Sequence, residues 1–314
     1  MAMGCWAIAG DAFWGEQDES DAIEAIHAAM DSGVNFYDTA EGYGNGYSEE
    51  VLGRALEGRR ERAIIATKAS GNHHTPEGLR AGCEDSLRRL RTDYLDLYQL
   101  HWPSRNIPFA DTWGAMQELI AEGKVRVGGV SNFGPRDLTR LLEAGHPDVN
   151  QLAYNLLFRA IEFEIQPLCE QREVSILCYS SIAQGLLTGK FRAPEDVPEG
   201  RARTRHFSPD RGMARHGEPG AEDETFRAIA EVRKIADELG APMHHVAIAW
   251  LIRRPAVASV LVGMRNRHQA LDNAAAADLD LPPEVMERLN AVTEDLKNRL
   301  GSNADMWQGD SRIE

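Results

Sequence analysis

Eight short apolar runs, separated by longer amphipathic segments, place the strongest constraint on how this chain can fold. The runs lie at 4–9, 34–37, 63–67, 94–100, 125–130, 148–151, 174–179 and 258–262. Short apolar runs that alternate with helical patterns are typical of buried parallel strands with helices packed outside them. We therefore predict a closed (β/α)8 barrel of the TIM type. An open, doubly wound sheet is the alternative.

The length of the chain favours a single domain that spans residues 1–314. A barrel of this type takes about 250 residues or somewhat more, and 314 residues at 43% hydrophobic content suit one such unit. Two segments break the strand–helix alternation. Residues 190–222 are polar and rich in Pro, Gly and Arg, which predicts a long loop after the seventh strand, and 301–314 is expected to form a loose tail. Loops of such length are usually functional or disordered.

Composition excludes several classes of function. The formal net charge is −15, whereas a nucleic-acid binder needs a basic face, so we expect no nucleic-acid partner. No run approaches the roughly 18 apolar residues that span a membrane. The four cysteines are far apart and form no C-x-x-C pair. Without a secretory signal, they are expected to be reduced thiols of a cytoplasmic protein.

The candidate chemistry lies where the predicted strands end, because active sites of such barrels are built at the C-terminal ends of the strands. The second strand is followed by Asp38 and then Tyr43, the third by Lys68 and the fourth by His101. A tyrosine has a pKa of about 10, and a nearby ammonium would lower it. A buried lysine in turn needs a partner such as Asp38. These four residues suit protonation of the oxyanion that forms when a hydride adds to a carbonyl, and the hydride must come from a cofactor.

The glycine-rich stretch after the second strand is a competing candidate for a phosphate-binding loop. Gly42 and Gly44 match the first two positions of the G-x-G-x-x-G fingerprint, but Tyr47 occupies the third. The fingerprint therefore fails, and these glycines are expected to let a tight loop present Tyr43.

A better phosphate site follows the last strand, where Gly263 and Arg265 precede a helix. Backbone N–H groups at a helix start favour anions, and an arginine side chain can bind a phosphate with two parallel hydrogen bonds. On composition alone, a solvated basic face is at least as good an explanation of the arginines at 253–267.

These motifs together resemble the aldo-keto reductase superfamily over nearly the whole chain. The resemblance rests on DTAEGYGNGYSEEVLG, the lysine of IIATK, LYQLHWP, VRVGGVSNFG, YSSIAQGLLTGKF and VGMRNRHQALDNAAAA. It implies a barrel that binds NADP(H) without a Rossmann domain, with Asp38, Tyr43, Lys68 and His101 as the catalytic tetrad. It also implies a set of cofactor-binding residues: Ser131, Asn132 and Gln151 at the carboxamide, Tyr179 stacked on the nicotinamide, Ser180, Gly185, Leu186 and Lys190 beside the pyrophosphate, Arg265 at the 2′-phosphate after Gly263, and Gln269 and Asn273 near the adenine.

The substrate pocket and possible metal sites are less well specified by the sequence. Trp14, Trp102 and Phe133 are expected beside the site, although ordinary packing explains them as well. His73–His74 and His244–His245 look like metal-binding pairs, but adjacent residues usually point apart, so no metal site is predicted. The arginine-rich stretch 201–215 is expected either to fold over the cofactor or to be a mobile loop.

The leading hypothesis is an NADPH-dependent enzyme that reduces an aldehyde or ketone to an alcohol, or catalyses the reverse reaction. Its only expected partner is a small-molecule carbonyl substrate, and the choice between monomer and homo-oligomer is open. One alternative is a nicotinamide-binding regulatory subunit that resembles the potassium-channel β subunits. Another is a lyase that uses Lys68 as a Schiff-base nucleophile.

Overall fold

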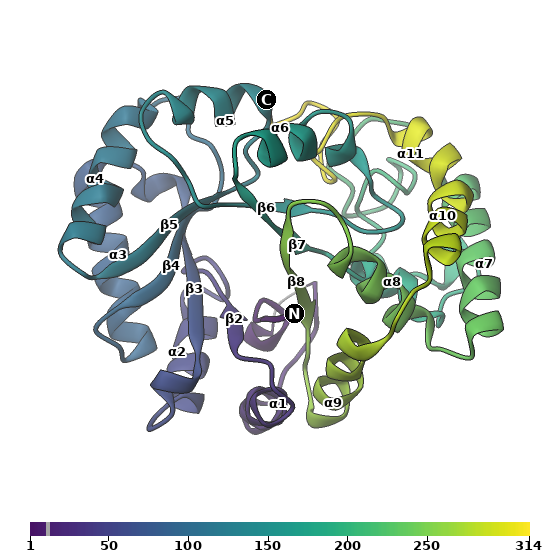
Figure 1. Ribbon diagram of the computed structural model, residues 1–314, viewed down its shortest axis with the longest axis horizontal. Helices are drawn as coiled ribbons and strands as arrows, with labels where there is room; N and C mark the ends of the chain where they lie inside the picture. The colour runs from purple at the N-terminus through teal and green to yellow at the C-terminus, as the bar shows by residue number, and fades with distance from the viewer. Residues whose placement is uncertain (11–12) are drawn as a thin grey trace.

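Eight parallel strands close into a barrel in the computed structural model of the chain, which describes residues 1–10 and 13–314 (Figure 1). The strands are β1 (Ala2–Gly4), β2 (Phe36–Asp38), β3 (Ile64–Ala69), β4 (Leu95–Leu100), β5 (Val125–Ser131), β6 (Val149–Ala153), β7 (Ser175–Tyr179) and β8 (Val257–Gly263). Each strand pairs with its neighbours in the sequence, and β1 pairs with β8, for example through Met3 and Val262. The predicted single-domain (β/α)8 barrel is therefore confirmed, and the alternative of an open sheet is excluded.

The position of the first strand was predicted wrongly. Residues 4–9 were expected to be a strand, but β1 ends at Gly4 and Ala7–Ala9 form a 3₁₀ turn. The reason is tertiary, because only Met3 and Gly4 have partners on β2. Beyond them the chain turns across the barrel mouth, and alanines favour helical turns over strands.

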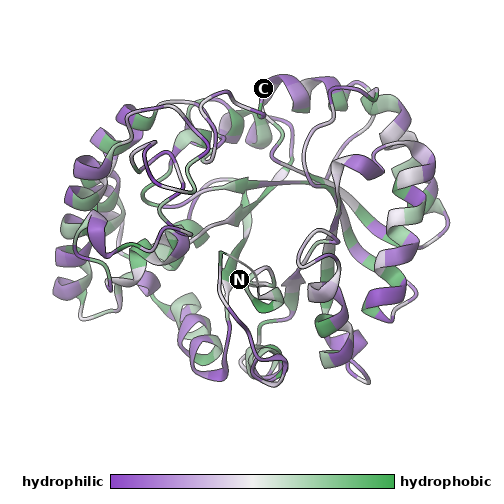
Figure 2. Cartoon of the chain, turned by 180° about the vertical axis from the view of Figure 1, so that it is seen from behind, coloured by the Kyte–Doolittle hydropathy of each residue, from purple (hydrophilic) through white to green (hydrophobic). Residues whose placement is uncertain are grey.

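The helices surround the barrel and carry both hydrophilic and hydrophobic residues (Figure 2). They are α1 (Glu19–Asp31), α2 (Tyr47–Ala55), α3 (Pro76–Leu90), α4 (Phe109–Ala121), α5 (Pro135–Leu142), α6 (Ile165–Gln171), α7 (Glu222–Leu239), α8 (Met243–Ile252), α9 (Arg267–Ala275), α10 (Pro283–Val292) and α11 (Glu294–Leu300). Local signals set their starts: the Asp18 side chain accepts hydrogen bonds from two backbone N–H groups of α1, and Thr75 caps α3. Within the described residues, no helix is both long and apolar enough to cross a bilayer.

The interior of the barrel changes from apolar to polar along the strands. One apolar cluster consists of Ala2, Ala66, Leu97, Leu177 and Leu261. Because alternate residues of a strand face the same side, Lys68 and Gln99 follow Ala66 and Leu97 on the inward face. The barrel is thus filled by hydrocarbon at one level and by hydrogen-bonding groups at the next, towards the C-terminal ends of the strands. A larger apolar core lies between strands and helices.

The C-terminal tail, expected to be loose, is packed against the barrel. Asp305 is fully buried and accepts two hydrogen bonds from Arg312, at 2.7 and 3.0 Å. The backbone N–H of Glu314 donates to the buried carboxylate of Asp137. Buried carboxylates need charged or N–H partners, so these contacts fix a segment that shows no periodicity in the sequence.

The long loop 190–222 is joined to the same tail. Apart from a 3₁₀ turn at Pro194–Asp196 and its last residue, Glu222, which begins α7, its described residues form irregular structure. The Arg205 side chain is buried and donates to the carbonyl oxygens of Leu300 and Asn303, both at 2.8 Å. The loop and the tail therefore pack together above the barrel mouth.

Candidate active site

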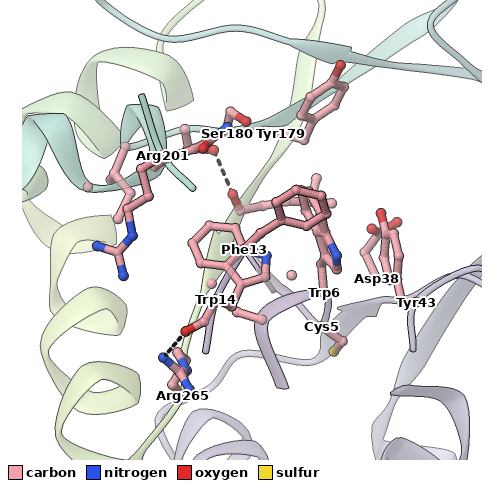
Figure 3. Close-up of a pocket in the computed structure, with 18 of the residues that line it drawn as sticks. Cys5, Trp6, Phe13, Trp14, Asp38, Tyr43, Tyr179, Ser180, Arg201 and Arg265 are labelled. Atoms are coloured by element: carbon pink, nitrogen blue, oxygen red, sulfur yellow. Dashed lines mark hydrogen bonds between the residues drawn. The ribbon is translucent and has the colours of Figure 1, made fainter. Parts of the chain in front are cut away.

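The four predicted catalytic side chains converge at the C-terminal mouth of the barrel, where Asp38 and Tyr43 lie side by side (Figure 3). Lys68 is fully buried, and its ammonium group makes all three of the hydrogen bonds that it can donate. It donates to Asp38 Oδ1 at 2.6 Å, to the carbonyl oxygen of Thr39 at 2.8 Å and to Tyr43 Oη at 3.2 Å. Because the phenol oxygen accepts this bond, the phenolic proton of Tyr43 is left to donate in another direction.

The second carboxylate oxygen of Asp38 is held from the opposite side. It accepts hydrogen bonds from Gln151 Nε2 at 2.7 Å and from Gln99 Nε2 at 3.4 Å. Gln151 was expected beside a nicotinamide, and the structure places it on Asp38 at the cavity wall. Gln99 was missed by the sequence analysis, although the two-residue period of β4 places it on the inward face.

Burial sets the direction of the pKa shifts in this site. Burial raises the pKa of the Tyr43 phenol, and the Lys68 charge lowers it only in part. Lys68 therefore has the predicted effect on the pKa of Tyr43, but burial, which the sequence does not show, outweighs it and the net pKa is raised. Burial also opposes the charge of Lys68, but Asp38 outweighs it and the pKa of Lys68 is raised. Burial, together with the Lys68 and His74 charges, lowers the pKa of His101 to about 3, so that its imidazole is neutral at ordinary pH.

The Tyr43 ring is fixed between two other rings. Trp6 stacks on it with centroids 5.8 Å apart, and the His101 ring meets its edge at the same distance. The loop that carries Tyr43 turns through Gly44 and Gly46, whose φ angles of 58° and 91° lie in the left-handed region. A Cβ at Gly44 would approach the Cβ of Ala9 to 3.0 Å. The glycines thus serve the turn, as the sequence predicted.

A cavity of about 740 Å³ extends from this tetrad across the barrel mouth. Most of the predicted cofactor and substrate residues line it: Ser131, Asn132, Gln151, Tyr179, Ser180, Gly185, Lys190, Gly263, Arg265, Gln269, Asn273, Trp14 and Trp102. Leu186 and Phe133 are not among the described residues at its surface. Phe133 is fully buried and packs against Phe109; it follows Asn132, whose φ of 64° departs from the extended backbone of β5 and changes the direction of the next side chain. Leu186 is buried in the core beside α8.

The cavity wall beside the tetrad is a chain of hydrogen bonds. Tyr179 Oη donates to Asn132 Oδ1 at 2.8 Å, and Asn132 Nδ2 donates to the carbonyl oxygen of His101 and to Ser131 Oγ, both at 3.1 Å. Trp307 and Arg312 of the C-terminal tail line the same cavity as Tyr179. The tail therefore contributes to the cavity that contains the predicted nicotinamide site, although no pattern in its sequence predicts this.

The far end of the cavity is rich in cations (Figure 3). Arg265 binds the segment that follows β1, with Nε on Gln17 Oε1 at 2.7 Å and Nη1 on the Trp14 carbonyl at 2.8 Å. Lys190 and Arg201 both approach Gly185, where a Cβ would come within 3.2 Å of Lys190 Nζ and 3.6 Å of Arg201 Nη1. Burial lowers the pKa of both cations, and the positive charge of Arg201 lowers that of Lys190 further. Arg201 was seen only as part of an arginine-rich stretch.

Aromatic rings and two arginines form the outer mouth. The Arg312 guanidinium lies 3.7 Å from the centre of the Trp102 ring. The Arg203 guanidinium lies 4.0 Å from the Phe13 ring and 4.4 Å from that of Trp307. Trp102 was predicted here, and Arg203 belongs to the stretch 201–215 that was expected either to fold over the cofactor or to be mobile. Arg312 of the tail was missed.

The histidine pair His244–His245 does not point apart, contrary to the sequence expectation. Both rings contact Asp272, with His244 Nε2 2.9 Å from Oδ2 and His245 Nε2 3.1 Å from Oδ1.

Comparison with known proteins places this geometry in a family. A sequence model described as the aldo/keto reductase family matches residues 1–294. A methylglyoxal reductase from Escherichia coli, named as NADH-specific, is 31% identical over 95% of each chain. A rice protein named as a probable voltage-gated potassium channel subunit β is 30% identical over 96% of this chain and 95% of its own. A crystal structure of an aldo-keto reductase from Klebsiella pneumoniae in complex with NADPH superposes with a TM-score of 0.74 at 30% identity, covering 93% of this chain and 90% of the other. The chain therefore belongs to the aldo-keto reductase family.

Proposed function

We propose that this protein is an NADPH-dependent carbonyl reductase, or catalyses the reverse oxidation of an alcohol, with Tyr43 as the proton donor. The observation that carries the proposal is the saturated ammonium group of Lys68. Its three hydrogen bonds leave the Tyr43 phenol as an acceptor from Lys68 and a donor towards the cavity.

Cationic and amide groups on the wall of the cavity make it suitable for a dinucleotide. Two partly desolvated cations, Lys190 and Arg201, face a glycine that leaves their head groups accessible to an anion. The buried amide nitrogen of Gln184, also on the cavity wall, has no hydrogen-bond partner among the described residues. A buried donor without an acceptor is unfavourable, so a bound polar group would complete the site.

The chemistry divides between the cofactor and the side chains. When bound, NADPH supplies the hydride that adds to the carbonyl carbon. Tyr43 then gives its proton to the carbonyl oxygen, and the Lys68 ammonium, 3.2 Å from Tyr43 Oη, stabilises the phenolate that remains. His101 is neutral and can donate one ring N–H to the same oxygen. General acid catalysis of this kind contributes about 10²–10⁴-fold.

The two alternatives have less support in this site. The lyase needs an uncharged Lys68, but the pKa of Lys68 is raised by Asp38. The alternative of a regulatory subunit has a relative in the rice protein named as a probable channel subunit. Under this alternative, the present chain would bind the cofactor without rapid turnover. Turnover therefore separates it from the reductase.

The experiment compares the wild type with Tyr43→Phe, and uses Tyr47→Phe as a matched control. Tyr47 lies outside the cavity, and its hydroxyl binds Glu19 at 2.6 Å. NADPH consumption is followed with methylglyoxal, aromatic aldehydes and ketones, and cofactor binding is followed by NADPH fluorescence. We expect Tyr43→Phe to lose about 10²–10⁴-fold in kcat while its affinity for NADPH is retained. Full activity of Tyr43→Phe would refute the proton-donor role, and binding without turnover in the wild type would favour the regulatory alternative.

A further inference from the structure

Two adjacent histidines and an aspartate from a different helix meet at the edge of the cavity. His244 and His245 lie in the first turn of α8, and Asp272 lies in α9. The two imidazole rings are 4.5 Å apart and nearly perpendicular, and each Nε2 faces one oxygen of the same carboxylate. Within the part of the chain that the structure describes, this is the one group of three His, Cys, Asp or Glu side chains whose ligand atoms lie within 4.8 Å of one another.

The environment of the group is intermediate between core and solvent. The side chains of His244 and His245 are 14% and 12% exposed, and that of Asp272 is 37% exposed. The Asp272 carboxylate is exposed enough for water to satisfy its hydrogen bonds. It therefore does not need two largely buried imidazoles as hydrogen-bond partners. An ion can reach the group from the cavity side, because His244 and Asp272 both line the cavity.

The ligand types select the class of ion. Imidazole nitrogen suits zinc, copper, nickel and iron, whereas magnesium and calcium prefer sites built from oxygen alone. Catalytic and exchangeable zinc sites commonly use three protein ligands and leave a fourth position for water. We propose that His244, His245 and Asp272 form a binding site for a divalent transition metal ion such as Zn²⁺.

The position of this site couples it to the nucleotide end of the cavity. Asp272 is adjacent to Asn273, and Gln269 lies one turn earlier on α9, so an ion on Asp272 would sit beside the residues expected to meet the adenine. A metal ion bound there would engage the Asp272 carboxylate, so that this carboxylate could no longer contact a bound nucleotide. The ion would also occupy part of the volume that the nucleotide needs. Metal and NADPH are therefore expected to bind antagonistically, and this step rests on the proposed function.

The first test measures metal binding to the cofactor-free full chain after removal of adventitious metal with a chelator. Zn²⁺ is titrated by calorimetry, and Co²⁺ by the visible absorption of its complex, into the wild type, His245→Gln and Asp272→Asn. His268→Gln is the control, because His268 lines the same cavity but lies outside the group. We expect one ion per wild-type and control chain. Loss of a ligand should weaken binding by more than about 100-fold, since even outer-shell partners of a metal are worth about 10–100-fold.

The proposal is overturned if the wild type binds no ion stoichiometrically, or if His245→Gln and Asp272→Asn bind it as tightly as the control. Circular dichroism of each variant establishes that it is folded, so a loss of binding reports on the site itself.

The second test measures NADPH affinity by fluorescence with and without saturating Zn²⁺. Linkage requires that Zn²⁺ weaken NADPH binding by the same factor by which NADPH weakens Zn²⁺ binding. His245→Gln should remove the effect, because His245 belongs to the metal group but is not among the residues at the cavity surface. An NADPH affinity that is indifferent to bound Zn²⁺ would refute the antagonism. A wild type that binds Zn²⁺ but not NADPH would refute the proposed function while supporting the metal site.

Discussion

Replacing Lys68 by methionine tests how the candidate active site is held together. Lys68 and Asp38 have side-chain exposures of 0% and 3%, and their charged atoms are 2.6 Å apart. Removing the ammonium leaves the Asp38 carboxylate buried, with Oδ2 still bound by Gln151 but Oδ1 without its charged donor. Removing one partner of a buried ion pair costs about 3–5 kcal/mol of folding stability, so Lys68→Met should be destabilised by that amount.

The double variant Asp38→Asn/Lys68→Met separates two contributions to the loss of folding stability: the uncompensated charge of Asp38 and the lost contacts of Lys68. Asparagine needs no counter-charge, so the double variant should recover at least about 2 kcal/mol of the loss. Activity should not recover, because neither variant retains the ammonium that stabilises the Tyr43 phenolate in the proposed mechanism. Both should lose about 10²–10⁴-fold in kcat. Stability and activity are therefore expected to diverge between the single and the double variant.

The assay is urea unfolding at pH 7.5, followed by circular dichroism and tryptophan fluorescence. Stabilities are compared only where the two transitions coincide and the m value is unchanged. Lys124→Met serves as the control, because Lys124 forms its ion pair with Glu84 at the surface, where such a pair is worth less than about 1 kcal/mol. A double variant no more stable than Lys68→Met would refute the reasoning from an uncompensated charge, and an active Lys68→Met would refute the role of the ammonium.

Three further predictions follow from the cavity and the core. Arg265→Met should weaken the binding of NADPH at least about 10-fold more than the binding of NADH, because a guanidinium–phosphate pair is charge-assisted. The control Gln17→Ala loosens the same segment but keeps the guanidinium, so it should affect both cofactors alike. Equal losses of affinity for NADPH and NADH in Arg265→Met would contradict the 2′-phosphate contact. Gly185→Ala should lose about 1 kcal/mol of stability and weaken NADPH binding in a fluorescence titration, because its φ is 96° and the new Cβ would meet the head group of Lys190. Burial lowers the pKa of His206 to about 4, whereas the pKa of this group in the unfolded chain is about 6.5. Between these pH values the unfolded state binds one more proton than the folded state, so the free energy of unfolding falls as the pH falls. The wild type should therefore lose about 2–3 kcal/mol more than His206→Gln between pH 7.5 and 4.5 in urea unfolding, and parallel pH profiles would show that His206 does not titrate in this way.

Much of the barrel was predictable because strands and helices leave periodic signals. Seven of the eight predicted strands end within two residues of the observed ones, whereas β1 was misplaced because its pairing partners on β2 and β8 decide its length. The tetrad was predictable for a related reason: parallel strands all end at one mouth, so polar residues that follow different strands meet there. Gln99 was missed because it lies inside the apolar run of β4.

The outer part of the cavity was predictable only in part, because its residues come from irregular segments. The stretch 201–215 was expected, as one of two alternatives, to fold over the cofactor, but which of its side chains reach the cavity was not predicted. Arg201 belongs to the long loop, and Arg312 and Trp307 belong to the tail. Neither segment has a period from which the direction of a side chain can be inferred. The pair His244–His245 was misjudged for another reason. The rule that neighbouring helical residues diverge describes the Cβ directions, but long side chains in the first turn of a helix can bend back to a shared third partner. Asp272, 27 residues further along the chain, is that partner.

Burial of Tyr43, which the sequence does not show, divides the roles that burial and Lys68 have in the proposed mechanism. From the sequence, the charge of Lys68 was the only known influence on the phenol, so its pKa was expected to fall. In the structure burial is the larger influence, and the phenol keeps its proton. A protonated phenol is the form that a carbonyl reductase needs before reaction. The Lys68 ammonium then acts mainly once the proton has been transferred, because its attraction to a phenolate is far stronger than to a neutral hydroxyl in a site with little water. In the proposed mechanism, Lys68 therefore stabilises the product of proton transfer while burial keeps the reactant phenol protonated, and the role of Lys68 requires that Asp38 keep it charged.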